Sequence, residues 1–374
     1  MYGGPIYMII YNQALNTYDR QIVSWLIICA LVIFGMIMLG GATRLTNSGL
    51  SMVEWRPLLG VIPPLSESSW LAVFEKYQQF PEYKKINQGM TLGEFKVIFM
   101  YEYLHRVLGR LIGVLFFFPM IYFTVKKRIK RGLSPKLWGL FFLGGCQGLL
   151  GWYMVKSGLV DKPHVSQYRL MAHLGLATAI YGFMLWVICD LLRPVKSVLK
   201  EDLGIAYLSV SLVFFIFVMI LSGGLVAGTD AGYAFNTWPM IGSDFIPSGL
   251  YGMEPYWLAI FEDILTIQFN HRMFAYFILC YSSFVAWRIL RNPKRAEMHF
   301  RAVLLLVALL LQVVLGISAL LLHVPVVLGV AHQAGAILLL STAILLAHAF
   351  REESVRTIED RIVGSNFSSL STQP

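Results

Sequence analysis

The chain has 374 residues, of which 57% are hydrophobic and 14% are charged, and its mean hydropathy is +0.65. Soluble domains are about 25% charged and less apolar, so a soluble domain, a disordered chain, a collagen and a disulfide scaffold are excluded. The formal net charge of +9 would suit a nucleic-acid binder, but so apolar a chain has no water-soluble exterior for a basic patch. We therefore expect an integral membrane protein that lies in the lipid bilayer and binds no nucleic acid.

Eight segments are long and apolar enough to be transmembrane helices, which need about 20 mostly apolar residues each. In chain order they are 22–43, 98–125, 137–156, 168–192, 204–228, 264–290, 301–323 and 326–350. Basic residues cluster after the second, fourth and sixth of these segments, at 126–131, 193–200 and 288–295. Because basic loops stay on the cytoplasmic side, we predict that both termini are cytoplasmic.

Two long loops, 44–97 and 229–263, are then left on the outer side. They contain turn signals and short amphipathic stretches such as 69–80, so we expect short interfacial helices that cover the bundle. The first twenty residues lack the features of a secretory signal or a transit peptide. This favours a multi-pass protein of the bacterial cell inner membrane over an imported mitochondrial protein.

The two halves of the chain share residues at constant spacing, which indicates an internal duplication. Gly40-Gly41, Thr46, Gly49 and Trp55 recur 183 residues later as Gly223-Gly224, Thr229, Gly232 and Trp238. The segment Glu102-x-x-His105-Arg106 recurs as Gln268-x-x-His271-Arg272, Gln147 and Gly151 recur as Gln312 and Gly316, and His173 recurs as His332.

The predicted fold is therefore all-α, with eight transmembrane helices in two duplicated four-helix bundles. An N-terminal cytoplasmic segment, 1–21, precedes the first unit, 22–192. The second unit, 204–350, is followed by a cytoplasmic tail, 351–374.

Four of the eight histidines, His105, His173, His271 and His332, lie near the outer ends of alternate spans, each about six or seven residues into its predicted helix. Ionisable residues inside a membrane are expensive to bury and are functional candidates for that reason. Paired imidazoles on facing helices favour haem iron, whereas zinc is disfavoured because companion Cys or Asp ligands are missing. The four cysteines form no C-x-x-C pair, which excludes covalent c-type haem attachment.

Glu102 lies one helical turn before His105 and shares its helix face. The second half has Gln268 at this place, which resembles glutamate in shape but cannot titrate. The asymmetry predicts proton-coupled chemistry in the first half and a structural or electron-transfer centre in the second. In the alternative interpretation, Glu102 merely pairs with Arg106 or Arg110.

Arg106 and Arg272 directly follow their histidines in sequence. Bidentate contacts with haem propionates are one interpretation of this position. Snorkelling of a helix-end side chain toward the interface is the other.

These motifs resemble those of the haem A synthase family. The resemblance extends from about residue 20 to residue 350 and is carried by Gly40-Gly41-Ala42-Thr43-Arg44-Leu45-Thr46, Ser48-Gly49-Leu50-Ser51, Glu102-x-x-His105-Arg106, Arg169-Leu170-x-x-His173, Asn270-His271-Arg272 and His332-Gln333. One class of the family has a cysteine pair in the first outer loop. That loop has no cysteine here, so the chain resembles the cysteine-free class shared by proteobacteria and mitochondria.

The resemblance implies a membrane oxidoreductase that oxidises a ring methyl of haem O to the formyl group of haem A, for cytochrome oxidase. It implies that His271 and His332 hold the iron of a haem b cofactor beside Arg272, and that the iron of haem O is received by His105 and His173 beside Arg106. Glu102 would be the catalytic residue, which accepts a proton or stabilises positive charge near the reacting methyl.

The implied partners are a haem O synthase and an electron-transfer protein whose identity the sequence leaves open. The oligomeric state is also open, with a homo-oligomer among the alternatives. Two other classes remain from the residues alone. A di-haem electron-transfer cytochrome explains the four histidines but not the lone Glu102, and a repeat-built transporter explains the duplication but not the matched histidine depths. At the inner face, His348 is expected to be solvated.

Overall fold

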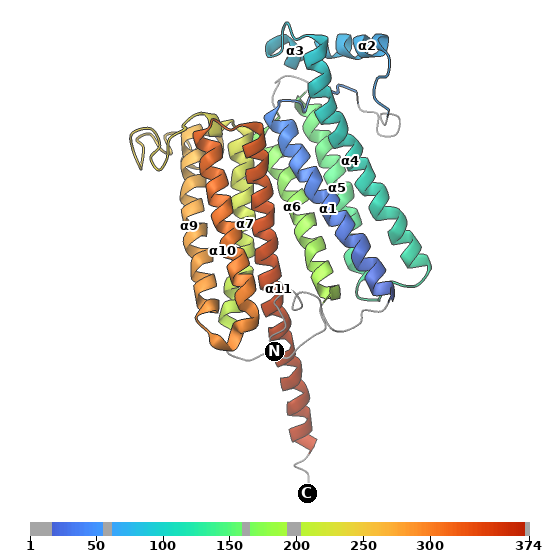
Figure 1. The fold of residues 1–374 in the computed structure, drawn as a ribbon, viewed down its shortest axis with the longest axis vertical. Helices are drawn as coiled ribbons and strands as arrows, with labels where there is room; N and C mark the ends of the chain where they lie inside the picture. Colours follow the sequence, from blue (N-terminus) through green and yellow to red (C-terminus); the bar gives the residue numbers. More distant parts are fainter. Residues whose placement is uncertain (1–16, 55–61, 159–164, 193–202, 371–374) are drawn as a thin grey trace, which may run out of the picture.

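The computed structural model describes residues 17–54, 62–158, 165–192 and 203–370, which form helices and no β-strand (Figure 1). The long helices are α1 (Thr17–Leu45), α4 (Leu92–Val125), α5 (Ser134–Gly158), α6 (Gln167–Leu192), α7 (Leu203–Gly228), α9 (Ile264–Leu290), α10 (Ala296–Leu321) and α11 (Val326–Leu370). The short ones are α2 (Glu67–Gln78), α3 (Pro81–Lys85), α8 (Tyr256–Glu262) and the 3-10 turns η3 (Ala231–Tyr233) and η4 (Pro293–Arg295). The predicted all-α class is confirmed.

Seven of the long helices have the length and apolar composition that a membrane crossing requires. They are α1, α4, α6, α7, α9, α10 and the part of α11 up to Phe350. The remaining predicted span forms α5, which is not among these candidates. Seven of the eight predicted spans are thus candidate spans by length and composition, and α5 as a span stays a prediction.

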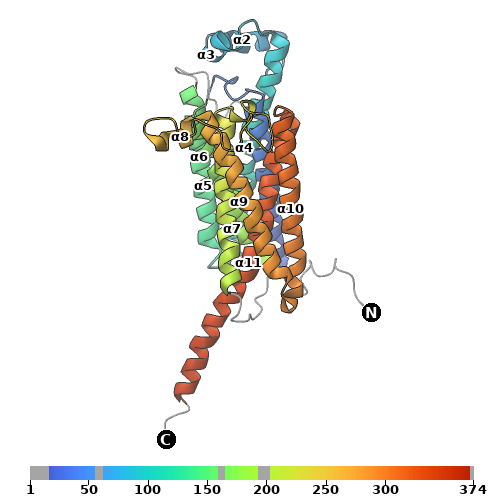
Figure 2. The same ribbon diagram turned by 90° about the vertical axis from the view of Figure 1, so that its left-hand side faces the viewer.

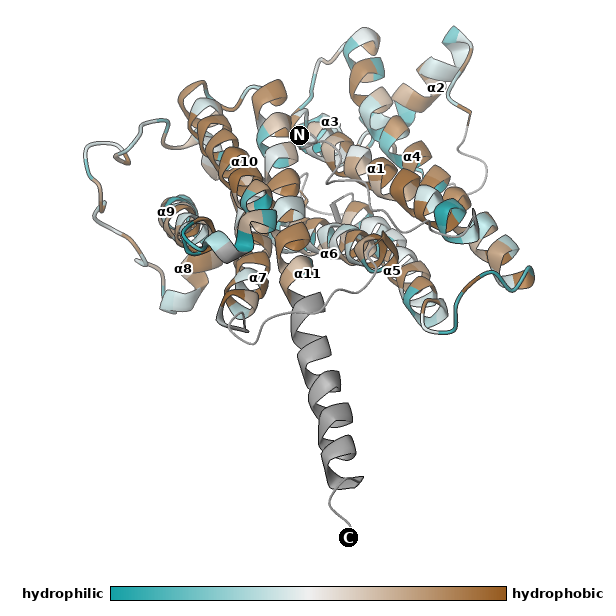
Figure 3. Cartoon of the chain, turned by 60° about the horizontal axis from the view of Figure 1, so that its bottom comes forward, coloured by the Kyte–Doolittle hydropathy of each residue, from teal (hydrophilic) through white to brown (hydrophobic). Residues whose placement is uncertain are grey.

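The long helices form two neighbouring rings of four. In the first ring, α1 packs against α4 and α6, and α5 packs against the same two helices. In the second ring, α7 and α10 each pack against α9 and α11. Figure 1 shows the two rings side by side, and Figure 3 shows apolar residues, in brown, along the helices of both.

The rings meet along α1 and α6 on one side and α7 and α11 on the other. Their buried side chains belong to one continuous core, which includes Leu26, Met184, Leu212 and Leu340. Because lipid tails are as apolar as these side chains, close packing rather than the hydrophobic effect holds membrane helices together.

The first outer loop builds a cap above the first ring (Figure 2). Helices α2 and α3 pack on the outer end of α4 through an aromatic cluster that contains Trp70, Phe74, Tyr77, Phe95 and Phe99. The predicted interfacial helix at 69–80 is thus α2, at Glu67–Gln78, and a capping box at Ser66 fixes its start.

Helix α4 begins six residues earlier than predicted, because Thr91 and Glu94 form a capping box at its N-terminus. His105 therefore lies thirteen residues into its helix, not six or seven. The other three histidines have the predicted positions in α6, α9 and α11. The outer turns of α4 support the cap, so depth in the membrane cannot be counted from the first residue of this helix.

One further expectation differs from the structure at the inner side. We expect His348 to be solvated, but it is only 4% exposed and its Nε2 lies 2.8 Å from Oδ1 of Asp190. The predicted tail 351–374 continues α11 as far as Leu370 (Figure 2). Most of segment 1–21, the basic loop 193–200 and Trp55 lie outside the described residues.

Candidate functional site

The predicted histidines form two pairs, one inside each ring. His105 on α4 and His173 on α6 are close enough for their imidazoles to interact electrostatically. His271 on α9 and His332 on α11 form the corresponding pair in the second ring. Each pair thus comes from two helices that face each other across the ring, as the sequence predicts.

A glycine on the neighbouring helix lies against each imidazole. A Cβ atom at Gly40 on α1 would lie 3.2 Å from Cε1 of His105, and one at Gly151 on α5 would lie 3.0 Å from that of His173. In the second ring the same distances are 3.6 Å from Gly223 on α7 to His271, and 2.7 Å from Gly316 on α10 to His332. These glycines belong to the duplicated blocks, and they allow the imidazoles to approach the helix backbone closely.

The Nδ1 atom of His271 differs from those of the other three histidines in its hydrogen bonding. Ser222 on α7 lies 3.1 Å from Nδ1 of His271, through its Oγ. For the buried Nδ1 atoms of His105, His173 and His332, no partner is found among the described residues. A histidine that ligates a metal usually donates its other ring N–H to a fixed partner, and Oγ of Ser222 can take this part for His271. Nε2 of His173 lies 3.4 Å from Nε2 of Gln147.

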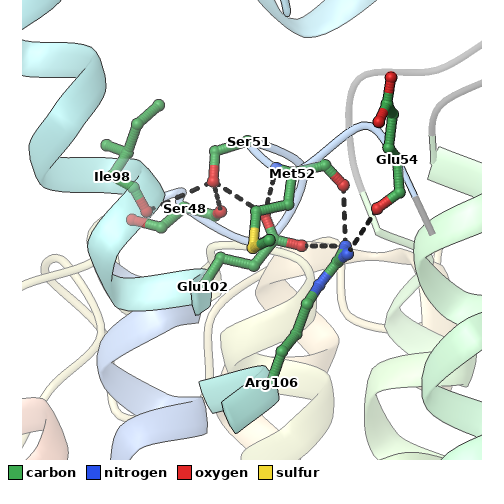
Figure 4. A network of polar contacts seen from close by, with 7 residues as sticks. All are labelled: Ser48, Ser51, Met52, Glu54, Ile98, Glu102 and Arg106. Carbon is green, nitrogen blue, oxygen red and sulfur yellow. Dashed lines mark hydrogen bonds and ion pairs between the residues drawn. The ribbon is translucent and has the colours of Figure 1, made fainter. Parts of the chain in front are cut away.

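Glu102 is buried and holds the first outer loop (Figure 4). Its Oε2 accepts hydrogen bonds from Oγ of Ser51 at 2.8 Å and from the backbone N–H of Met52 at 2.7 Å. Its Oε1 is paired with Nη2 of Arg106 at 2.5 Å. Arg106 also donates to the backbone carbonyls of Met52 and Glu54, at 2.9 and 3.1 Å. The carboxylate therefore accepts from three donors, and the pairing with Arg106 that the sequence left as an alternative is present.

Gln268 and Arg272 hold the second outer loop in the same register. Nη2 of Arg272 donates to the carbonyl of Phe235 and Nη1 to that of Thr237, both at 2.8 Å. Phe235 and Thr237 lie 183 residues after Met52 and Glu54, which is the spacing of the duplication. Gln268, however, donates its amide N–H groups to the carbonyls of Ala231 and Phe235, at 2.7 and 3.2 Å.

The two arginines thus bind loop carbonyls in this structure. Arg272 still has a buried Nε–H for which the described residues provide no acceptor. Contact of either guanidinium with a haem propionate stays a prediction.

A second buried acid lies in the cap above Glu102. Glu82 on α3 is 5% exposed, and its Oε2 finds no hydrogen-bond partner in the described part of the chain. Its carboxyl group is hydrogen-bonded to the hydroxyl of Tyr77, which also accepts a hydrogen bond from Asn87. Burial, together with the charge of Glu102, raises the pKa of Glu82 to about 8.

The two loops are also tied to each other. Arg44, at the end of α1, donates to Oδ1 of Asn47 at 3.0 Å and to Oδ1 of Asp230 at 2.8 Å. Asn47 and Asp230 are equivalent in the duplication, and both have positive φ, of 48° and 56°. Asn and Asp tolerate this left-handed conformation better than most residues, so equivalent turns begin both outer loops.

The donor set fits haem. Each ring offers two imidazoles on facing helices, with buried ring nitrogens and glycine on the helix beside them, and bundle cores hold haem in this way.

Sequence reasoning missed three contributors: Ser222, Ser51 and the backbone N–H of Met52. Ser222 directly precedes the duplicated glycine pair, and Ser51 belongs to the quoted Ser48–Ser51 motif, but neither position carried a pattern specific for its contact. The path of the first outer loop decides which of its groups face Glu102, and the packing of α7 against α9 places Ser222 beside His271.

Comparison with known proteins agrees with this arrangement. The sequence model of the COX15-CtaA family, described as a cytochrome oxidase assembly protein, matches residues 23–344. The heme A synthase of Nitrosospira multiformis is 49% identical over 337 residues, which cover 90% of this chain and 95% of that protein. The heme A synthases of Nitrosomonas eutropha and Parvibaculum lavamentivorans are 48% and 46% identical, over 86% and 88% of this chain and 92% and 94% of their own lengths. The chain therefore belongs to the COX15-CtaA family of cytochrome oxidase assembly proteins.

Proposed function

We propose that the chain is a haem A synthase, a membrane oxidoreductase that converts haem O to haem A for cytochrome oxidase. Its relatives of this name cover nearly the whole chain. The observation that carries the proposal is the chemical difference between two otherwise matched sites. The first ring holds a buried carboxylate, Glu102, three residues before its histidine, and the second ring holds the neutral Gln268.

We propose that the first unit, 22–192, receives haem O through His105 and His173. Glu102 then serves the oxidation of the ring methyl to a formyl group, either by accepting a proton or by stabilising positive charge. Both oxygens of this carboxylate are occupied by donors. Its place is therefore fixed before the substrate binds, and a fixed charge needs little reorganisation during the reaction.

The second unit, 204–350, would hold haem b through His271 and His332. When bound there, haem b supplies electron transfer. The hydrogen bond between Nδ1 of His271 and Oγ of Ser222 supports a resident cofactor in this ring, because a permanent ligand benefits from a fixed orientation. The open Nε–H of Arg272 suits a propionate, and Arg106 would take the same part toward the substrate.

The finer topology belongs to the same proposal. The matched loop contacts of Arg106 and Arg272 support an internal duplication. The place of α5 in the first ring, equivalent to α10, supports eight spans in two units. Because positively charged loops stay on the cytoplasmic side, we place both termini in the cytoplasm and the chain in a bacterial inner membrane. The proposed partners are a haem O synthase and an electron-transfer protein. A homo-oligomer is an open alternative.

The test replaces Glu102 by Gln, the residue of the second ring, in a strain that makes haem O but lacks its own haem A synthase. Haems are extracted from the membranes and separated. We expect the haem A yield to fall about a hundredfold or more, which is the scale of general acid–base catalysis, while haem O accumulates. The control is Glu75→Gln, which changes an exposed carboxylate of α2 and should leave the yield unchanged.

A wild-type haem A yield from the Glu102→Gln variant would refute the role of Glu102. If the wild-type chain itself produced no haem A but bound two haems, it would be a di-haem electron-transfer cytochrome.

A further inference from the structure

Ser51 is the side chain through which the first outer loop holds Glu102. It is fully buried, and its Oγ lies 2.8 Å from Oε2 of Glu102 (Figure 4). The same oxygen lies 2.9 Å from the backbone carbonyl of Ser48 and 3.3 Å from that of Ile98. One hydroxyl proton is therefore surrounded by three acceptors.

This arrangement serves both protonation states of Glu102. When Glu102 is ionised, the hydroxyl donates to the carboxylate, because a charge-assisted hydrogen bond is the stronger one. When Glu102 carries a proton, the carboxyl group donates to Oγ of Ser51, and the hydroxyl turns to the carbonyl of Ser48. The backbone N–H of Met52, the other donor to Oε2, has no such alternative because it can only donate.

We propose that Ser51 is a positioning residue for Glu102, which keeps the carboxyl group in one place while it gains and loses a proton. No net proton leaves Ser51 in this exchange, since the hydroxyl only changes the acceptor to which it donates. This inference rests on the proposed function, in which Glu102 serves the chemistry.

The second ring provides an internal comparison. The positions equivalent to Ser48 and Ser51, 183 residues later, are Ala231 and Ala234. Gln268, which replaces Glu102, donates to backbone carbonyls and needs no hydroxyl. Within one chain, the serine thus occurs with the carboxylate and the alanine with the amide, as expected if the hydroxyl exists to serve an ionisable group.

In the described part of the chain, the other charged and titratable groups that interact with Glu102 lie on α4, α2 and α3. Arg106 on α4 is its ion-pair partner. Tyr77 on α2 and Glu82 on α3 interact with it electrostatically. None of these three residues is hydrogen-bonded to Oε2 of Glu102 in the structure. Ser51 is therefore the residue that can both donate to and accept from this oxygen.

The test is Ser51→Ala in the intact protein, assayed for haem A formation over a range of pH in membranes. Loss of a hydrogen bond to a charged group is expected to lower the rate about tenfold or more. The rising limb of the pH dependence should move to higher pH, because the ionised form loses the stronger bond. Ser51→Cys, with a weaker donor, should lie between wild type and Ser51→Ala. If the Ser51→Ala protein fails to accumulate in the membrane, the rate and pH dependence of Ser51→Cys are compared with wild type instead.

Two results would overturn the inference: a wild-type rate, or a lower rate with an unchanged pH dependence, which would indicate a structural role only. Ser211→Ala is the matched control. Ser211 lies on the inner half of α7, and the substitution removes a serine hydroxyl that is hydrogen-bonded to the hydroxyl of Tyr281 on α9. It should change neither the rate nor the pH dependence. If Glu102→Gln itself keeps full activity, the proposed function fails. If Glu102→Gln is inactive and Ser51→Ala behaves as wild type, only the present inference fails.

Discussion

Glu102 and Gln268 occupy matching places and hold the loops above them with opposite hydrogen-bond polarity. The carboxylate accepts from a hydroxyl, a backbone N–H and a guanidinium. The amide donates to two carbonyls and accepts from Arg272. A substitution at either place would therefore leave loop groups unpaired, and buried unpaired polar groups cost about 1–3 kcal/mol each.

At the residue scale, the sequence shows which residues differ between the two halves but not which groups they contact. The difference between Glu102 and Gln268 is visible from the duplication alone. The sequence does not predict that Arg106 and Arg272 bind loop carbonyls, because the folds of the loops decide which carbonyls face the helices. Ser222 could not be connected with His271 because this contact depends on the packing of α7 against α9.

One residue-scale prediction concerns Ser222. In the Ser222→Ala variant, His271 loses the hydrogen bond to its Nδ1. Removing such an outer partner typically weakens metal affinity about 10- to 100-fold. We expect the purified variant to lose haem b on dilution, measured by its absorption spectrum, while Ser211→Ala retains it. Equal haem retention in both variants would show that the hydrogen bond is irrelevant to the cofactor.

A second prediction concerns pH and the cap. Since burial raises the pKa of Glu82 from an ordinary 4.5 to about 8, the folded cap binds a proton more tightly than the unfolded one. The resulting stability is complete below the ordinary pKa and is lost as pH rises through about 8. As the pH rises from 4.5 to about 8, the backbone amides of α2 and α3 should therefore exchange hydrogen faster than those of the Glu82→Gln variant at the same pH. Identical pH dependence in the two proteins would contradict this assignment.

At the scale of helices, most boundaries follow from apolar length and from end signals. Helices α1 and α10 start five residues before their predicted spans. The largest difference at a helix start is that of α4, whose outer turns are polar and aromatic rather than uniformly apolar. Its start at Leu92 comes from the Thr91–Glu94 capping box, a local signal that a search for membrane spans does not use. The misplaced depth of His105 follows from this one omission.

The glycines beside the imidazoles give a prediction at the same scale. In Gly316→Ala, the new Cβ would lie 2.7 Å from Cε1 of His332, so the imidazole has to move. In Gly151→Ala the contact is with His173, in the other ring. We expect Gly316→Ala to weaken haem b binding about tenfold or more, and Gly151→Ala to keep haem b and lose haem A formation. The haem b spectrum and the haem A yield of the two variants are measured side by side. Loss of haem b from both variants, or retention of haem b in both, would contradict this prediction.

At the scale of the whole molecule, one glycine of each pair lies against a histidine of its own ring and the other lies against the neighbouring ring. Gly40 and Gly223 face His105 and His271, whereas Gly41 and Gly224 face the other ring, against Gln333 and Met171. Arg44 adds an ion pair to Asp230 on the outer side, but such partly exposed pairs contribute at most about 1 kcal/mol. Close packing at these glycines therefore adds to the continuous apolar core that joins the two rings.

The contact between α6 and α7 allows this to be tested. A Cβ at Gly228 would lie 2.7 Å from Cα of Gln167, where backbone cannot easily give way. Gly228→Ala is expected to destabilise the protein by about 1–3 kcal/mol through overpacking. At the other end of the same helix, Gly204→Ala meets nothing within 4 Å among the described residues and should be neutral. Thermal unfolding in detergent compares the two variants, and equal melting temperatures would count against the interface.

The central claim is that the two rings have different tasks, the first acting on haem O and the second holding haem b. The most direct measurement is the reduced-minus-oxidised spectrum of purified His105→Ala and His271→Ala proteins, with their haems extracted. We predict that His105→Ala keeps the haem b spectrum but yields no haem A, and that His271→Ala loses haem b. Loss of haem b from both variants, or from His105→Ala alone, would contradict the account.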